Sequence, residues 1–152
     1  MPVMTKDILL EDVRRDDLFE WLGNIENHQV FLKSATKGIE QQSNTELTLT
    51  ISSKFKSRQV GYILKKKDDE HGGRRIRIET TGKRSTGILS YSLRTMKPSR
   101  NTMLTITWDY KSGSILGMVL EQLSLQESYE TFLLTILQNI KEGKDSIPKI
   151  SD

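Results

Sequence analysis

The central part of the chain, from Thr45 to Tyr110, alternates apolar and polar residues with a period of two. Such alternation is typical of strands that bury one face of a sheet. Five segments show it and agree on which side is apolar: 47–51, 60–64, 76–78, 89–93 and 104–110. The connections between them are short and rich in turn residues. We therefore expect antiparallel hairpins, because a parallel crossover needs about a dozen residues or more.

A long amphipathic stretch from Leu116 to Ile140 follows the strands and predicts a C-terminal helix. Its apolar residues form two stripes, at 116, 119, 120 and 123 and at 125, 129, 132, 133, 136 and 140. On a straight helix these stripes would lie roughly 140° apart. We therefore expect a kink between residues 123 and 126, or a second partner surface for one stripe.

The N-terminal part predicts one strand over residues 4–13 and then two short helices. Asp17 and Glu20 have the spacing of a capping box at the start of the first helix, and Gly23 suits its end. Asn27 is then expected to cap a second helix that ends near Ser34. The predicted class is α+β, with a curved antiparallel sheet of about seven strands around the C-terminal helix.

Composition narrows the class of protein. The chain has 152 residues, which suits one domain, and we expect residues 1–142 to form it and residues 143–152 to be a flexible tail. No apolar run approaches the roughly 20 residues of a membrane span, and the start does not resemble a signal peptide. Cysteine is absent, which fits a reducing compartment, so we expect a cytoplasmic protein. Basic residues number 23 and acidic residues 20, a mixture that does not indicate a nucleic-acid binder.

The predicted order of elements resembles the helix-grip fold of the START-like superfamily (SRPBCC), which includes polyketide cyclases, birch-pollen-allergen-like proteins and coenzyme-Q-binding lipid chaperones. Residues 13–26, VRRDDLFEWLGNIE, are similar to the segment where such proteins enter their first helix. Residues 113–142 are similar to their glycine-led last helix. The resemblance implies an apolar cavity between sheet and last helix that holds lipids, sterols, polyketides or other hydrophobic molecules. It implies no shared catalytic residue.

The residues that would line such a cavity come from the apolar face of the sheet and from the last helix. The candidate ligand contacts are Phe31 at the mouth, then Leu49, Ile51, Tyr62, Tyr91, Ile106 and Trp108, and Leu116, Leu120 and Leu123 from the helix. The tyrosine hydroxyls and the indole would orient a ligand within apolar walls. The alternative is that these residues only pack the core. A void of about 300 Å³ or more would favour a ligand site.

The other candidate groups point to no reaction. His28 and His71 have no partners at the spacing of a metal motif, so we expect both on the surface and predict no metal, no cofactor and no catalytic residue. A basic cluster surrounds one pair of hairpins: Lys65, Lys66, Lys67, Arg74, Arg75, Arg77, Lys83 and Arg84. It suits a phosphate, an acidic partner or anionic lipid headgroups. A solvated strand edge that deters aggregation is favoured, because acidic residues 68–70 lie beside it.

The leading hypothesis from the sequence is a non-enzymatic module that binds or transfers a hydrophobic small molecule or lipid. One alternative is a cyclase- or aromatase-type enzyme that uses pocket tyrosines. Another is an adaptor in which the stripe around Tyr129 and Phe132 docks a second protein. Transient contact with a membrane surface and formation of a homodimer are kept as further alternatives, whereas nucleic acid is not an expected partner.

Overall fold

The computed structural model describes the backbone of residues 3–52, 57–82, 85–97, 100–112 and 115–150. Side chains are described for the same residues except 52, 70, 85, 111–112 and 115–128. Within these ranges, none of the helices contains a stretch long and apolar enough to cross a membrane.

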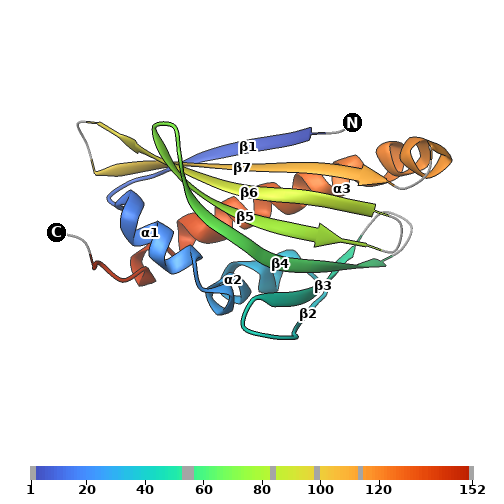
Figure 1. Cartoon of the computed structure of the whole chain (residues 1–152), viewed down its shortest axis with the longest axis horizontal. Helices are drawn as coiled ribbons and strands as arrows, with labels where there is room; N and C mark the ends of the chain where they lie inside the picture. The colour runs from blue at the N-terminus through green and yellow to red at the C-terminus, as the bar shows by residue number, and fades with distance from the viewer. Residues whose placement is uncertain (1–2, 53–56, 83–84, 98–99, 113–114, 151–152) are drawn as a thin grey trace.

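In the described ranges, seven strands form one antiparallel sheet in the order β1-β7-β6-β5-β4-β3-β2, accompanied by three α-helices (Figure 1). The elements are β1 (Val3–Leu10), α1 (Arg15–Leu22), α2 (Ile25–Leu32), a 3-10 turn (Lys33–Ala35), β2 (Gly38–Gln41), β3 (Glu46–Ser52), β4 (Ser57–Glu70), β5 (Gly73–Thr81), β6 (Ser85–Met96), β7 (Asn101–Ser112), α3 (Ile115–Glu142) and a 3-10 turn (Lys144–Ser146). The predicted α+β helix-grip architecture is confirmed.

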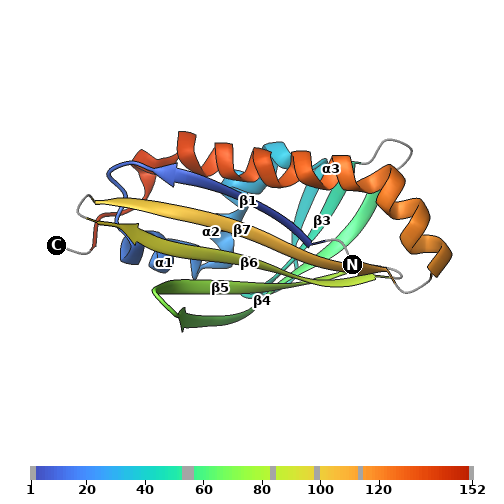
Figure 2. The same ribbon diagram turned by 90° about the horizontal axis from the view of Figure 1, so that it is seen from above.

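The last helix lies along one face of the curved sheet and contacts β1, β7 and α2. Figure 2 shows that the first turns of α3, drawn in orange, run in a different direction from the rest of the helix. The helix is nevertheless continuous from Ile115 to Glu142. This bend agrees with the change of direction expected from the two apolar stripes.

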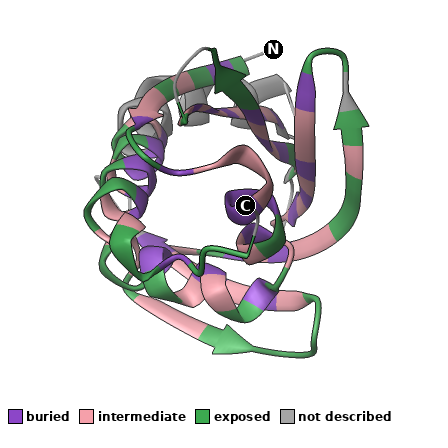
Figure 3. Ribbon diagram, turned by 90° about the vertical axis from the view of Figure 1, so that its left-hand side faces the viewer, coloured by how far each residue is buried: buried purple, intermediate pink, exposed green. Residues whose placement is uncertain are grey.

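The core lies between the sheet and the helices, and Figure 3 shows these elements arranged around a common interior. In β7, every second residue from Thr102 to Tyr110 is buried and the residues between them are half-buried. The neighbouring strands continue the same buried face with Ile76, Ile78, Leu89, Tyr91 and Leu93. The period-two pattern of the sequence therefore identified the buried side of the sheet.

The caps of the first two helices differ from the prediction. The N-cap of α1 is Arg14, with no side-chain cap, so Asp17 lies within the helix and is buried rather than capping it. Asn24, not Asn27, caps α2, because its side-chain oxygen accepts a hydrogen bond from Glu26 N at 3.1 Å. α2 therefore begins at Ile25, two residues before the predicted cap. Asn27 instead donates to Trp21 O at 2.8 Å.

The segment after α3 contacts the N-terminal elements. Ile147 is buried, and Lys144 Nζ donates to Glu11 O at 2.9 Å. The backbone N–H of Ile150 donates to the buried Asp17 carboxylate at 3.1 Å. That residues 143–152 are flexible in solution stays a prediction.

Candidate functional site

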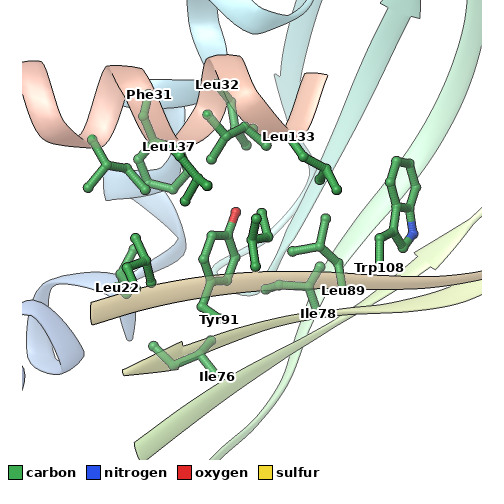
Figure 4. Close-up of a cluster of buried hydrophobic side chains, with 14 of the residues drawn as sticks. Leu22, Phe31, Leu32, Ile76, Ile78, Leu89, Tyr91, Trp108, Leu133 and Leu137 are labelled. Atoms are coloured by element: carbon green, nitrogen blue, oxygen red, sulfur yellow. The ribbon is translucent and has the colours of Figure 1, made fainter. Parts of the chain in front are cut away.

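Side chains fill the space between the sheet and the C-terminal half of α3. Figure 4 shows the Tyr91 hydroxyl pointing from β6 into this space, toward the side of Phe31, Leu32 and Leu137. All four of these side chains are buried. This part of the interior is core.

A chain of hydrogen bonds crosses this core from β6 to the end of α1. Tyr91 Oη lies 2.7 Å from Tyr62 Oη, which lies 2.7 Å from His28 Nδ1. His28 Nε2 lies 2.7 Å from Leu22 O, which can only accept a hydrogen bond. The Nε2 atom of the neutral ring must therefore carry the hydrogen, and Nδ1 accepts from Tyr62. The direction of donation follows as Tyr91 to Tyr62 to His28 to Leu22.

Burial keeps the members of this chain neutral. Burial lowers the pKa of His28 from 6.5 to about 4, although its hydrogen bond to Leu22 O opposes the effect. Burial also raises the pKa of both Tyr62 and Tyr91. At pH 7 the chain therefore consists of a neutral imidazole and two phenols. Its four connected segments, α1, α2, β4 and β6, are held together by uncharged hydrogen bonds.

The prediction that His28 lies on the surface is wrong, whereas His71 is exposed as expected. The sequence contains the signal that would have placed His28. It lies three residues after Ile25 and four before Leu32, so the three side chains share one face of α2. A polar residue within an apolar helical stripe is buried with it when hydrogen-bond partners are present.

A second cluster surrounds Trp108 on β7. Trp108 Nε1 donates to Thr80 Oγ1 at 2.9 Å. The ring of Tyr129 lies 4.7 Å from the Trp108 ring between centroids, and that of Phe132 lies 5.9 Å away. Both side chains are buried against Trp108, so the adaptor hypothesis, which needed them on the surface, is wrong.

A pocket of about 630 Å³ lies where β4 extends beyond the end of β5. In the described part of the sheet, the pairing of β4 with β5 ends at Gly61 and Thr81. Pairing of β4 with β3 continues to Ser57. The described lining consists of Glu46, Thr48, Ser57, Arg58, Gln59, Val60, Gly61, Thr81, Gly82 and Tyr129. The volume exceeds the value of about 300 Å³ expected of a small-molecule site.

The pocket reaches from the outer face of the sheet toward the aromatic cluster. Arg58 and Val60 alternate with the outward-facing Gln59 and therefore share the inner face of β4 with the buried Tyr62. Tyr129 approaches from α3 on the same side, and its ring packs against that of Trp108 at an interplanar angle of 35°. On the inner side, the described lining therefore consists of Val60, the Tyr129 ring and the Arg58 side chain. On the outer side it is polar, with Glu46, Thr48 and Gln59.

Seven of the ten predicted ligand contacts are core residues, and the other three lie outside the described side chains. Phe31, Leu49, Ile51, Tyr62, Tyr91, Ile106 and Trp108 are buried in the core. The side chains of Leu116, Leu120 and Leu123 lie outside the described residues. Within the described lining, the pocket wall contains none of these predicted contacts, and Trp108 adjoins it through Tyr129. Their contact with a ligand stays a prediction.

Acidic partners accompany much of the basic cluster on β4 and β5. Ion pairs of the described residues include Lys65–Glu79 at 4.0 Å, Lys66–Asp68 at 3.6 Å, Arg74–Asp69 at 3.2 Å, Arg74–Asp16 at 3.4 Å and Arg75–Asp68 at 3.3 Å. The hydrogen bond from Arg75 lowers the pKa of Asp68. Arg74 also lies 3.6 Å above the Phe19 ring. Lys83 and Arg84 lie outside the described residues. This pairing favours a solvated strand edge over an anion site.

No model of a known protein family matches the chain. No curated protein sequence matches it either.

Solved structures do resemble it. A START superfamily protein from Mycobacterium smegmatis has a TM-score of 0.63 at 13% identity, with 92% of this chain and 97% of that chain covered. The Zhui aromatase/cyclase from a Streptomyces species has a TM-score of 0.63 at 13% identity, with coverage of 95% and 93%. Norcoclaurine synthase from Thalictrum flavum, solved with dopamine and hydroxybenzaldehyde, has a TM-score of 0.59 at 12% identity, with coverage of 93% and 87%.

Proposed function

Because the chain has the helix-grip fold of the START-like superfamily, we propose that it binds a hydrophobic small molecule or lipid in the pocket beside β4. The observation that carries the proposal is the cavity of about 630 Å³ with an aromatic inner wall. Cavities of roughly 300–1,000 Å³ suit ligands of drug size.

The lining supports a ligand with both apolar and polar parts. Val60 and the Tyr129 ring supply apolar surface on the inner side, and Thr48 and Gln59 supply hydrogen-bonding groups at the rim. Tyr129 is held in place by Trp108, whose indole N–H is bonded to Thr80. A rigid layer behind a binding surface reduces the entropy lost on binding.

The proposed site extends to α3, because Tyr129 of this helix lines the pocket. Leu116, Leu120 and Leu123 remain proposed contacts on this ground. The buried residues Leu49, Ile51, Tyr62, Tyr91, Ile106 and Phe31 would form the packed layer behind the site. Action in the cytoplasm as a carrier is part of the proposal.

Ligand binding is tested by delipidating the protein, incubating it with cell extract and measuring the masses of intact complexes by native mass spectrometry. Gln59→Phe places a ring in the pocket from an exposed position, and Thr95→Phe places one on β6 at an exposed site outside the lining. We expect one bound species per chain, lost in Gln59→Phe and retained in Thr95→Phe. Absence of any bound species, together with no binding of fluorescent fatty acids, would refute the proposal.

A second candidate function is cyclase- or aromatase-type catalysis. The observation that favours it is Glu46, an ionisable carboxylate in the pocket wall that can serve as a base within reach of a substrate. The resemblance to an aromatase/cyclase suggests aromatic or polyketide-like substrates. If the protein is such an enzyme, Glu46→Gln will bind the same compound without converting it, as product analysis by mass spectrometry would show.

A further inference from the structure

Three residues of the pocket wall form one row across the outer face of the sheet. Gly61 on β4 pairs with Thr48 on β3 and with Thr81 on β5, and all three line the pocket. The next residues along β4 and β5, Tyr62 and Thr80, are buried on the inner face. Because side chains alternate along a strand and paired residues share a face, Thr48 and Thr81 point outward on either side of Gly61. We call Thr48, Gly61 and Thr81 the hydroxyl row.

The glycine in the middle of the row brings the two hydroxyls close together. A β-carbon at Gly61 would collide with Thr81 Oγ1, so this oxygen occupies the place that a side chain would fill. The β-carbons of directly paired residues lie about 5 Å apart, which places the Thr48 and Thr81 hydroxyls roughly 5 Å apart across the Gly61 backbone. One oxygen atom between two such groups can form hydrogen bonds of about 2.8 Å to both.

Both hydroxyls of the row can still bond to a ligand. Thr48 Oγ1 accepts a hydrogen bond from Gln42 Nε2 at 3.2 Å, so the hydrogen of the Thr48 hydroxyl is available to donate. In the described part of the chain, no residue hydrogen-bonds to the Thr81 hydroxyl, whereas the adjacent Thr80 hydroxyl accepts from Trp108 Nε1 at 2.9 Å. A ligand oxygen that accepts from both hydroxyls therefore replaces water at the row without breaking a bond within the protein.

Two carboxylates flank the row on the same face, and they define the competing chemistry. Glu46 and Glu79 both pair with Ile63, two residues beyond Gly61 on β4. Glu79 lies 4.0 Å from Lys65, and Glu46 lies in the pocket wall. Glu46 would attract an ammonium group. An ammonium group has no lone pair, however, and cannot accept the hydrogen that the Thr48 hydroxyl has available.

We propose that the polar head of the ligand carries an oxygen that accepts hydrogen bonds, as in a ketone, ester, amide or alcohol, and that the Thr48 and Thr81 hydroxyls hold it over Gly61. The apolar body of the ligand then extends from the row toward Val60 and the Tyr129 ring on the inner side of the pocket. The inference rests on the proposed binding function and names the chemistry of the head group that this pocket selects.

The test measures affinity by NMR titration for four probes that share one carbon skeleton: acetophenone, 1-phenylethanol, 1-phenylethylamine and ethylbenzene. The proteins are the unmodified chain, Thr48→Val, Thr81→Val and Thr95→Val. Valine keeps the shape of threonine and removes only the hydroxyl. Thr95 is the control, because it is an exposed threonine of β6 outside the described lining. Circular dichroism and thermal melts confirm that each variant is folded.

We expect acetophenone and 1-phenylethanol to bind more tightly than ethylbenzene, although ethylbenzene is the more hydrophobic molecule. Thr48→Val and Thr81→Val should each lower the affinity for acetophenone about fivefold, because each removes one hydrogen bond to the ligand oxygen. Neither variant should lower the affinity for ethylbenzene, which separates loss of the hydroxyl from damage to the pocket. Thr95→Val should leave the affinities for all four probes unchanged.

Equal affinities for acetophenone and ethylbenzene would overturn the head-group assignment and leave the binding function intact. An acetophenone affinity that both valine variants leave unchanged would equally overturn it. If 1-phenylethylamine binds most tightly of the four, the head group is a cation facing Glu46 and the assignment is wrong. If no probe binds the folded chain, the result counts against both the assignment and the proposed function.

Discussion

Acid should destabilise the fold through His28. The ring is fully buried, and burial lowers its pKa to about 4, from 6.5 in an ordinary environment. In the unfolded chain the ring binds a proton near pH 6.5, whereas in the folded chain it does so only near pH 4. Between these values the unfolded state holds more protons, so the free energy of unfolding falls as the pH decreases. This contribution is fully present above pH 6.5.

The size of the effect follows from the two pKa values. Each unit of difference corresponds to roughly 1.4 kcal/mol, so the full loss is about 3 kcal/mol. About 2 kcal/mol of it should be lost between pH 7 and pH 4.5. The geometry explains the cost, because a proton on Nδ1 would face the hydrogen that Tyr62 donates to it. Tyr62 and Tyr91 would both have to reverse their hydrogen bonds.

Urea denaturation at pH 7 and pH 4.5 measures the effect, with His28→Gln and His71→Gln compared with the unmodified chain. Carboxylates also contribute to acid sensitivity, so the relevant quantity is the difference in pH dependence between variants. His28→Gln should reduce the loss of unfolding free energy between pH 7 and pH 4.5 by about 2 kcal/mol, and His71→Gln, at an exposed position, serves as the control. Ring ¹⁵N shifts should show the hydrogen on Nε2 until about pH 4. Titration of His28 near pH 6.5, or a hydrogen on Nδ1, would refute the reasoning.

Three further substitutions test the packing. Gly87→Ala should lower the free energy of unfolding by about 2 kcal/mol or more, because the new Cβ would lie 2.7 Å from Asp109 O. Gly38→Ala is the control: the atom nearest to its new Cβ is 4.0 Å away, so urea denaturation should show an unchanged free energy of unfolding. Tyr91→Phe removes the donor to Tyr62 and should cost about 1 kcal/mol; an unchanged unfolding midpoint would contradict the hydrogen-bond chain. Asn139→Ala loses bonds to Phe31 O and Ser34 Oγ and should cost about 1 kcal/mol, more than the exposed Gln138→Ala.

The architecture was predictable because it depends on periodic patterns. Alternation marked the buried residues of the strands, and two apolar stripes on the last helix indicated its bend. Cap positions were not predictable to the residue, since Asn24 and Asn27 are both good caps and tertiary contacts decide between them. The alternative that Tyr129 and Phe132 form a docking surface is wrong because the sequence does not show that their stripe of the helix packs against the sheet.

The site was harder to predict than the fold. The pocket depends on where β4 loses its pairing with β5, which is a property of strand register and sheet curvature rather than of local sequence. Arg58 lies in a polar stretch that reads as a turn and a strand start, so the sequence does not show that it lines a pocket together with Val60. The burial of His28 follows from its place in the apolar stripe of α2 with Ile25 and Leu32, whereas the absence of a metal motif around it does not bear on burial.

The central claim is that the pocket beside β4 binds an amphipathic molecule. The most direct measurement is amide chemical-shift mapping by NMR of the ¹⁵N-labelled chain during titration with 1-naphthoate. We expect saturable shifts concentrated at residues 57–61, 81–82 and 129, with residues 100–103 at the other end of the sheet unaffected. Saturable shifts centred elsewhere, or no shifts at millimolar probe, would contradict it.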